Sequence, residues 1–298
     1  MTLRHPMLVE MLIAHAMVAY RGQIQMMPIR TPASQLPARS RRHARLLPPL
    51  RTITALVMRE MSTRYGRSPG GYLWAVLDPL GMIVLMGVGF SLMMHKPPIG
   101  SSFLLFMATG LMPFNMFNAI SGVMARALMF SKPLLMYPGV TWGDALLARL
   151  ILNAMTGLLV SWLIMTGVVA WEGVRVIIDI RAIALSMGLA ILLGAGIGCL
   201  NCFLFMAFPV WEHAWSILTR PLFMVSGVFF LVDTMPVGVR DMLWYNPVAH
   251  LIVLMREGFH DSYHGGFASP LYVLGVALVP LLAGLLLLWR HHLDLLNT

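Results

Sequence analysis

The sequence predicts an all-α polytopic membrane protein. Six transmembrane helices are expected, with an amphipathic helix before the first and a re-entrant segment between the fifth and the sixth. Of its 298 residues, 58% are hydrophobic and 11% are charged, whereas soluble chains carry about 45–50% apolar and about 25% charged residues. The chain also contains several apolar stretches of about 20 residues, the length that crosses a bilayer. A mean hydropathy of +0.78 agrees with both observations.

The N-terminal region is strongly basic. The formal net charge is +9, and eleven of the 21 Lys and Arg residues lie at or before Arg67. Such a block beside a first span anchors the chain to anionic lipid on the cytoplasmic side. Nucleic-acid binding is excluded, because no folded reading motif accompanies the charge. Residues 1–49 are therefore predicted to form a poorly ordered, basic cytoplasmic extension, rich in Pro and Arg from Pro28 to Pro49.

An amphipathic helix is predicted over Leu50–Tyr65. Apolar side chains recur there at helical spacing, and Arg59 lies on the opposite face, although Arg64 falls close to the apolar stripe. A helix of this kind lies flat on the cytoplasmic membrane surface. Ser68-Pro69-Gly70-Gly71 then breaks the chain before it enters the bilayer. The predicted interfacial motif comprises Arg59, Arg64, Tyr65 and Arg67.

Six segments are predicted to cross the membrane. Five are apolar over the whole length that a crossing helix needs. The other, near Ala214–Val232, is interrupted by Arg220-Pro221, and Trp211 and Trp215 anchor its first turn among the headgroups. The five uninterrupted spans lie near Tyr72–Met94, Phe103–Ala125, Leu150–Ala170, Ala182–Phe208 and Phe267–Trp289.

The segment Val248–Met255 is apolar but too short to cross. Asn246-Pro247 opens it and Arg256-Glu257-Gly258 ends it. A stretch of this length is typical of a re-entrant or interfacial segment. Such backbone is stable at membrane depth only against protein or a watery cavity. We therefore expect it to dip into the membrane from the periplasmic side, between the fifth and sixth spans.

Six spans return both termini to one side of the membrane. If that side is the cytoplasm, sixteen of the 21 Lys and Arg residues lie inside and five outside, which is the expected asymmetry. The transmembrane domain is predicted to cover residues 50–292, and residues 293–298 form a cytoplasmic tail.

The chain lacks a phosphate-binding loop. Its only lysines are Lys96 and Lys132, which follow His95 and Ser131, so the motif GxxxxGK[ST] does not occur. The chain is therefore predicted not to be an enzyme and to bind no cofactor of its own. Any ATP and Mg must be bound by a partner subunit.

Two patterns resemble metal sites but have simpler explanations. The run His260-Asp261-Ser262-Tyr263-His264 has Asp in place of the Glu of HExxH, and two glycines follow it, which disfavours a continuing helix. Cys199 and Cys202 form a CxxC inside an apolar run, where a redox or zinc site lacks water and polar neighbours. They are better explained as small residues of a membrane helix, like Gly194 and Gly198, whose GxxxG spacing lets helices approach closely. No metal site is predicted.

Two stretches resemble a known family. Arg64–Pro79, with the sequence RYGRSPGGYLWAVLDP, resembles the start of the first span of ABC-2 type permeases that export capsular polysaccharide and O-antigen. Asn246–Phe259 resembles the segment before their last span, and the likeness extends from about Leu50 to Arg290. The resemblance implies an inner-membrane homodimer that works with two copies of a nucleotide-binding ATPase, and it leaves room for periplasmic export proteins. It implies a lipid-linked, often acidic polysaccharide as cargo, moved from cytoplasm to periplasm.

The resemblance also implies that two cytoplasmic loops contact the ATPase. They correspond to Ala127–Asp144 and Pro209–His213. The residues expected at this contact are Ser131, Lys132, Tyr137, Asp144, Glu212 and His213.

Aromatic residues are candidates for lining the path of a glycan. A glycan has polar hydroxyls and apolar C–H faces, so aromatic rings can guide it while binding it weakly. Packing in the core or facing lipid is the alternative for each ring. The expected conduit residues are Trp74 in the first span, Phe223, Phe229 and Phe230 in the fifth, and Asp78, Trp244, Tyr245 and Arg256.

Two of these residues allow a second interpretation. Asp78 is either a polar contact in the conduit or a carboxylate held at the membrane interface by nearby arginines. Arg256 either pairs in two-point fashion with acidic groups of the glycan, or faces headgroups or pairs with Asp241 or Glu257.

Other functions are compatible with the sequence. An ABC-2 permease could carry another cargo, such as O-antigen, teichoic acid or a drug. A membrane-embedded transferase acting on lipid-linked sugars would need an essential group at the membrane edge, for which Asp78 and His250 are the candidates. A purely structural membrane scaffold would not need the re-entrant segment.

Overall fold

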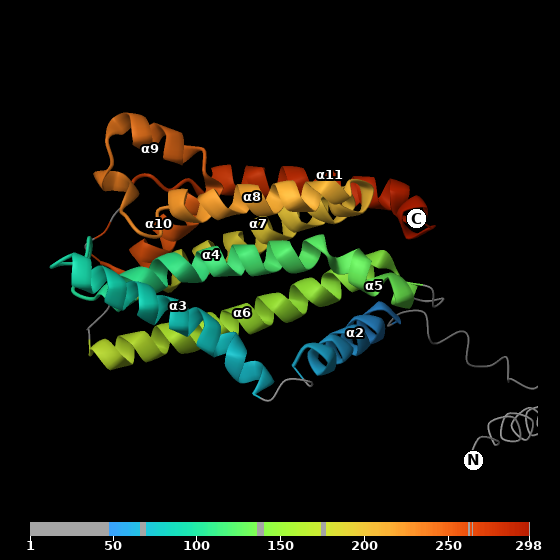
Figure 1. Cartoon of the computed structure of the whole chain (residues 1–298), viewed down its shortest axis with the longest axis horizontal. Coiled ribbons are helices and arrows are strands. Elements are labelled where there is room, and N and C mark those ends of the chain that lie inside the picture. Colours follow the sequence, from blue (N-terminus) through green and yellow to red (C-terminus); the bar gives the residue numbers. More distant parts are fainter. Residues whose placement is uncertain are drawn as a thin grey trace, which may run out of the picture. The chain divides into compact units, whose positions relative to one another are not determined.

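The computed structural model describes residues 48–65, 70–135, 140–173, 177–261, 263 and 265–297. In these ranges every regular element is a helix: ten α-helices and one short 3₁₀-helix (Figure 1). The predicted all-α class is therefore confirmed. Residues 1–47 of the predicted extension, Arg67 and Tyr137 lie outside the described residues, as do the side chains of Arg64 and Tyr65.

Five helices are long and apolar enough to cross a membrane, within the described part of the chain. They correspond to the five uninterrupted spans that the sequence predicts, which are confirmed as helices. The last of them continues through most of the predicted tail. These helices are α3 (Gly71–Met93), α4 (Phe103–Ala125), α6 (Trp142–Glu172), α7 (Ile180–Ala207) and α11 (Pro270–Asn297).

Helix α6 begins at Trp142 and not near Leu150 as predicted. The reason is a capping box, in which the Thr141 hydroxyl accepts from the Asp144 amide at 3.2 Å and the Asp144 carboxylate accepts from the Thr141 amide at 3.0 Å. These polar residues resemble a loop in the sequence but start a helix. The predicted loop Ala127–Asp144 therefore contains helix α5 (Ala127–Leu135) and the first turn of α6.

Helix α8 (Pro209–Val225) differs from the predicted span Ala214–Val232 at both ends. Pro209 takes the first helical position, where its missing N–H costs no hydrogen bond. The helix ends before Gly227, whose φ of 82° lies in the left-handed region that favours glycine. Phe229 and Phe230, expected within the span, therefore lie in the turn that follows it.

The segment predicted to be re-entrant is a short, buried helix. After the 3₁₀-helix η2 (Val232–Thr234) and α9 (Val237–Trp244), α10 covers Pro247–Phe259. The Asn246 side chain caps it by accepting from the Val248 amide at 3.0 Å. All but two of its thirteen residues are buried, in contacts with α4, α7, α9 and α11. The apolar run that is too short to cross thus packs against protein.

Helix α7 packs against α4 on one side and against α11 on the other, with the backbones close together. A Cβ at Gly194 would lie 2.9 Å from the Phe117 carbonyl oxygen of α4, and one at Gly198 would lie 2.9 Å from that of Ser121. The close approach predicted from the GxxxG spacing is therefore confirmed. Gly196 faces the other side, where a Cβ would lie 2.2 Å from the Ala277 carbonyl oxygen of α11.

Helices α2, α3 and α5 lie around α4 and α6, whereas α8 packs on α7 and α9 packs on α10. Helix α2 (Pro48–Tyr65) packs mainly on α6, and α3 packs mainly on α4. In Figure 1, α2 and α5 lie near one end of α4 and α6, whereas α9 and α10 lie near the opposite end of α4. We name the first of these the α5 end and the second the α9 end.

Candidate functional site

Three cavities meet at one residue of α4. Asn118 borders all of them, and Asn118 and Ala119 are exposed in a part of α4 that is otherwise largely buried. The cavities have volumes of about 840, 430 and 550 Å³. We name them, in that order, the arginine pocket, the amide cavity and the α8 cleft.

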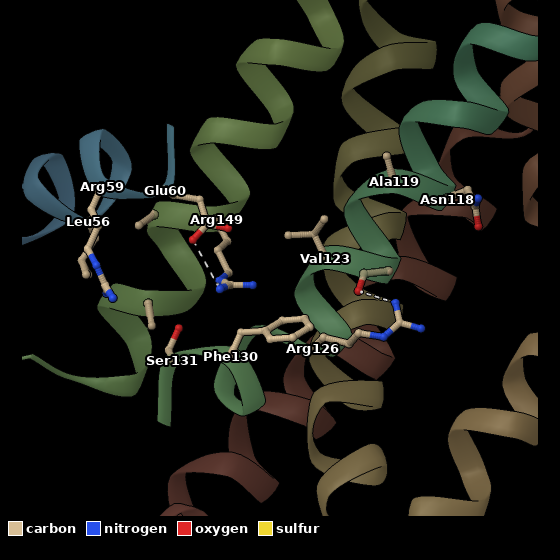
Figure 2. A pocket seen from close by; sticks show the side chains of 13 residues that line it. Leu56, Arg59, Glu60, Asn118, Ala119, Val123, Arg126, Phe130, Ser131 and Arg149 are labelled. Atoms are coloured by element: carbon tan, nitrogen blue, oxygen red, sulfur yellow. Dashed lines mark hydrogen bonds and ion pairs between the residues drawn. The ribbon is translucent and has the colours of Figure 1, made fainter. Parts of the chain in front are cut away.

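The arginine pocket lies at the α5 end, between α2, α4, α5 and α6 (Figure 2). The Arg149 guanidinium is 3.3 Å from the Glu60 carboxylate and 5.6 Å from the centre of the Phe130 ring. Arg59 from α2 and Arg126 from the end of α4 complete the charged lining. Three arginines and one glutamate give this lining an excess of positive charge, so the pocket suits an anion.

The amide cavity contains two of the predicted conduit residues. Trp74 and Asp78 of α3 both border it, opposite α4 and α6. The other polar groups in its lining are neutral amides and hydroxyls, which can donate to and accept from sugar hydroxyls. They are Asn115, Asn118, Asn153, Thr156 and Ser161. This cavity therefore offers an aromatic face beside hydrogen-bonding groups, the combination that a glycan needs.

The α8 cleft contains two more of the predicted residues. Phe223 and Phe229 line it together with Arg220. Their rings meet edge to face with centroids 5.0 Å apart, and Phe223 also packs on Phe114 at 4.9 Å. Phe230 is not among the described residues that line these cavities.

Arg256 has different partners from those expected. It has no exposed surface, and its guanidinium donates to the carbonyl oxygens of Phe230 at 2.8 Å and Val228 at 2.9 Å. It also lies 4.1 Å from the centre of the Phe106 ring, and Gly110 leaves room for it on α4. Arg256 therefore ties the turn after α8 to α10 and α4. The sequence offers no signal for this, because the acceptors are backbone groups distant in the chain.

Trp244 and Tyr245 belong to an aromatic group at the α9 end. The Trp244 ring packs on Tyr272 with centroids 4.6 Å apart. His250 is buried next to these rings. Its Nε2 lies 2.8 Å from the Trp244 carbonyl oxygen, and its Nδ1 accepts from the Ser269 amide. Because both ring nitrogens are bonded to backbone, His250 has no nitrogen left for acid–base chemistry on a substrate.

Comparison with known proteins identifies the family. A family model of ABC-2 type transporters matches residues 51–260. The chain belongs to the ABC-2 type transporter family. The resemblance seen in the sequence is thereby confirmed.

Several relatives of this ABC-2 protein align over most of its length. The polysialic acid transport protein KpsM of Escherichia coli is 31% identical over 79% of this chain and 92% of its own. The capsule polysaccharide export inner-membrane protein CtrC of Neisseria meningitidis serogroup A is 27% identical over 80% and 91%. The protein BexB of Haemophilus influenzae, of the same description, is 24% identical over 80% and 89%.

An ion pair links one of the two segments of the ABC-2 protein that are expected to contact an ATPase to the residue just before the other. Arg126 at the end of α4 donates to the Glu212 carboxylate in the first turn of α8 at 2.8 Å. Ser131 is buried beside the arginine pocket, and Lys132 is half-buried in the last turn of α5. His213 is exposed next to Glu212.

At the α5 end, the structure shows contacts of Asp144, Glu60 and Arg149 that the sequence does not indicate. The Asp144 carboxylate is used in the cap of α6. Sequence reasoning missed both Glu60–Arg149 and the role of Arg126. An arginine at the polar end of an apolar helix is the only local signal, and it does not identify the partner.

Proposed function

We propose that this ABC-2 protein is the membrane-spanning subunit of an exporter that moves a lipid-linked, capsular-type polysaccharide from the cytoplasm to the periplasm. The similarity to capsule-export proteins over about four fifths of the chain carries the proposal. The amide cavity and the α8 cleft support it, because they offer aromatic and hydrogen-bonding groups and meet at Asn118 of α4.

The proposed topology has six passes in the inner membrane, with both termini in the cytoplasm. Helix α8 has 17 residues and serves as the fifth pass together with the turn that follows it. The amphipathic helix α2 lies on the cytoplasmic surface, and α10 dips in from the periplasmic side. Residues 1–49 form the extension, 50–292 the transmembrane domain and 293–298 the tail. The basic N-terminal region supports this orientation.

The proposed assembly is a homodimer with two copies of an ATPase, which bind the ATP and Mg. Exposed apolar side chains on α3 and α6, such as Leu85, Leu92 and Trp162, support contacts with lipid or a second copy. Helix α5 and the first turn of α8 form the docking surface for the ATPase, and periplasmic proteins continue the route outward. This chain contributes no cofactor site and binds no nucleic acid.

A membrane-embedded transferase is not favoured. Its two candidate groups lie apart, since Asp78 borders the amide cavity whereas His250 is buried in α10 among backbone partners. Nothing pairs either group with a second catalytic side chain among the described residues.

Purification from the native host should separate these functions. We expect an ATPase to co-purify with the tagged chain, and the isolated chain to hydrolyse no ATP.

Deleting the gene should leave glycan inside the cell, and wild-type protein should restore surface glycan. ATP turnover by the isolated chain, or export that persists with an inactive ATPase partner, would contradict the proposal.

The chain offers a matched pair of variants for the docking surface. Lys132→Glu reverses a charge on α5, and Lys96→Glu reverses an exposed charge in the loop after α3. Because interface charges control association, Lys132→Glu should lower ATPase recovery several-fold and make it more sensitive to salt. Lys96→Glu should recover as much ATPase as the wild type. Equal recovery with both variants would remove Lys132 from the docking surface.

A further inference from the structure

The arginine pocket has the charge and the volume of an anion-binding site. Arg59 of α2, Arg149 of α6 and Arg126 at the end of α4 line one hollow of about 840 Å³ (Figure 2). Among the described residues that line it, Glu60 is the only carboxylate. Three arginines from separate elements thus border one hollow with two glutamates, Glu60 and Glu212, as partners, and this excess of positive charge favours an anion.

We propose that this pocket binds the phosphodiester group of a membrane-anchored lipid. That group is present both in phospholipid headgroups of the bilayer and in a phosphate that links a lipid to a glycan. The second source rests on the function proposed above, whereas the first does not. The ligand chemistry is the same in both.

Arginine suits this ligand for geometric and electrostatic reasons. Its planar guanidinium forms two parallel hydrogen bonds to a phosphate, and basic pockets between membrane helices on the cytoplasmic side bind lipid headgroups. Arg149 is 9% exposed, so salt screens its charge less than that of a surface arginine. The volume of about 840 Å³ accommodates a headgroup and the start of its substituents.

Two carboxylates would compete with the phosphate. Arg149 pairs with Glu60 at 3.3 Å, which is longer than the roughly 2.8 Å of a short charge-assisted hydrogen bond. Arg126 pairs with Glu212 of α8 at 2.8 Å. A bound phosphate would therefore compete for Arg149 and Arg126, whose ion pairs link α2 to α6 and α4 to α8. Removing a competing carboxylate should strengthen phosphate binding.

The pocket continues into the amide cavity. Asn118 and Ala119 border both. If the phosphate lies at the arginines, the group attached to it extends past Asn118 toward Trp74 and Asn115. Those residues suit a polyhydroxylated substituent, because amides bond to hydroxyls and the indole packs on C–H faces.

Binding of phosphatidylglycerol to the full-length purified chain, measured by native mass spectrometry in detergent, tests the site. We expect Arg149→Gln to weaken binding at least tenfold and Glu60→Gln to strengthen it several-fold. Arg240→Gln is the control, because Arg240 pairs with Asp233 at the α9 end, away from the pocket. Thermal unfolding of each variant is measured in parallel, and Glu60→Gln tests the site without removing an arginine. Unchanged affinity in both Arg149→Gln and Glu60→Gln overturns the proposal.

A second titration assigns the source of the phosphate. Phosphatidylinositol mannoside carries a glycan on its phosphodiester, and phosphatidylglycerol does not. Tighter binding of the mannoside, lost in Asn118→Leu, assigns the pocket to a glycan-linked lipid. Equal binding of the two assigns it to bilayer phospholipid. Neither titration depends on the ATPase or on export, so failure here is distinct from failure of the proposed function.

Discussion

Replacing Gly196 with alanine is expected to remove most of the folded protein. An added Cβ would lie 2.2 Å from the Ala277 carbonyl oxygen, a contact that a rotamer change cannot relieve. Helices α7 and α11 would have to separate, and overpacking of this kind costs about 3 kcal/mol or more. Thermal unfolding in detergent should show a much lower Tm and a small yield of monodisperse protein.

Gly188→Ala provides the control on the same helix. No heavy atom lies within 4 Å of a Cβ at this position, and alanine favours a helix more than glycine does. We expect the Tm to stay the same or to rise slightly. Similar Tm values for Gly188→Ala and Gly196→Ala would refute the close packing of α7 on α11.

Replacing Arg256 with methionine is expected to have the second large effect. The side chain is fully buried, and its loss leaves the carbonyl oxygens of Val228 and Phe230 without these donors. Each buried, unpaired carbonyl costs about 1–3 kcal/mol. Arg256→Lys keeps the charge but not the forked geometry, so we expect it to fall between methionine and the wild type.

Two readouts separate this anchoring role from the conduit role predicted from the sequence. The anchoring role predicts a lower Tm and faster hydrogen exchange at the amides of residues 226–232. A conduit role predicts lost export with unchanged stability. Arg240→Met serves as the control, because Arg240 is about two-fifths exposed and its contact with Asp233 is 3.7 Å long. Normal Tm and exchange in Arg256→Met would contradict the anchor.

The sequence predicts the five long apolar helices well, because each apolar run is sufficient evidence by itself. The limits of α6 and α8 are less predictable. Thr141 and Asp144 resemble loop residues until the capping box forms, and Gly227 ends a helix whose apolar sequence continues beyond it. Both ends depend on backbone geometry, which composition does not encode.

The residues that line the cavities are also predictable from the sequence only in part. Four of the residues that the sequence predicts for the conduit border cavities, and their role in transport stays a prediction: Trp74, Asp78, Phe223 and Phe229. The arginine pocket could not be predicted, because the pairs Arg149–Glu60 and Arg126–Glu212 join segments far apart in the chain. Asn118, which borders all three cavities, is inconspicuous in an apolar sequence.

Helix α4 has different neighbours on its two sides. On one side, glycines bring α7 within backbone contact of α4 and α11. On the other side, α3 and α6 pack on α4, where Gly157 of α6 faces the flexible Met116 side chain, and the arginine pocket and the amide cavity lie along this seam. Sliding of α3 and α6 along the seam would be a shear motion, which needs only small side-chain adjustments. Such sliding would widen or narrow these two cavities while the backbone contacts of α7 with α4 and α11 are kept.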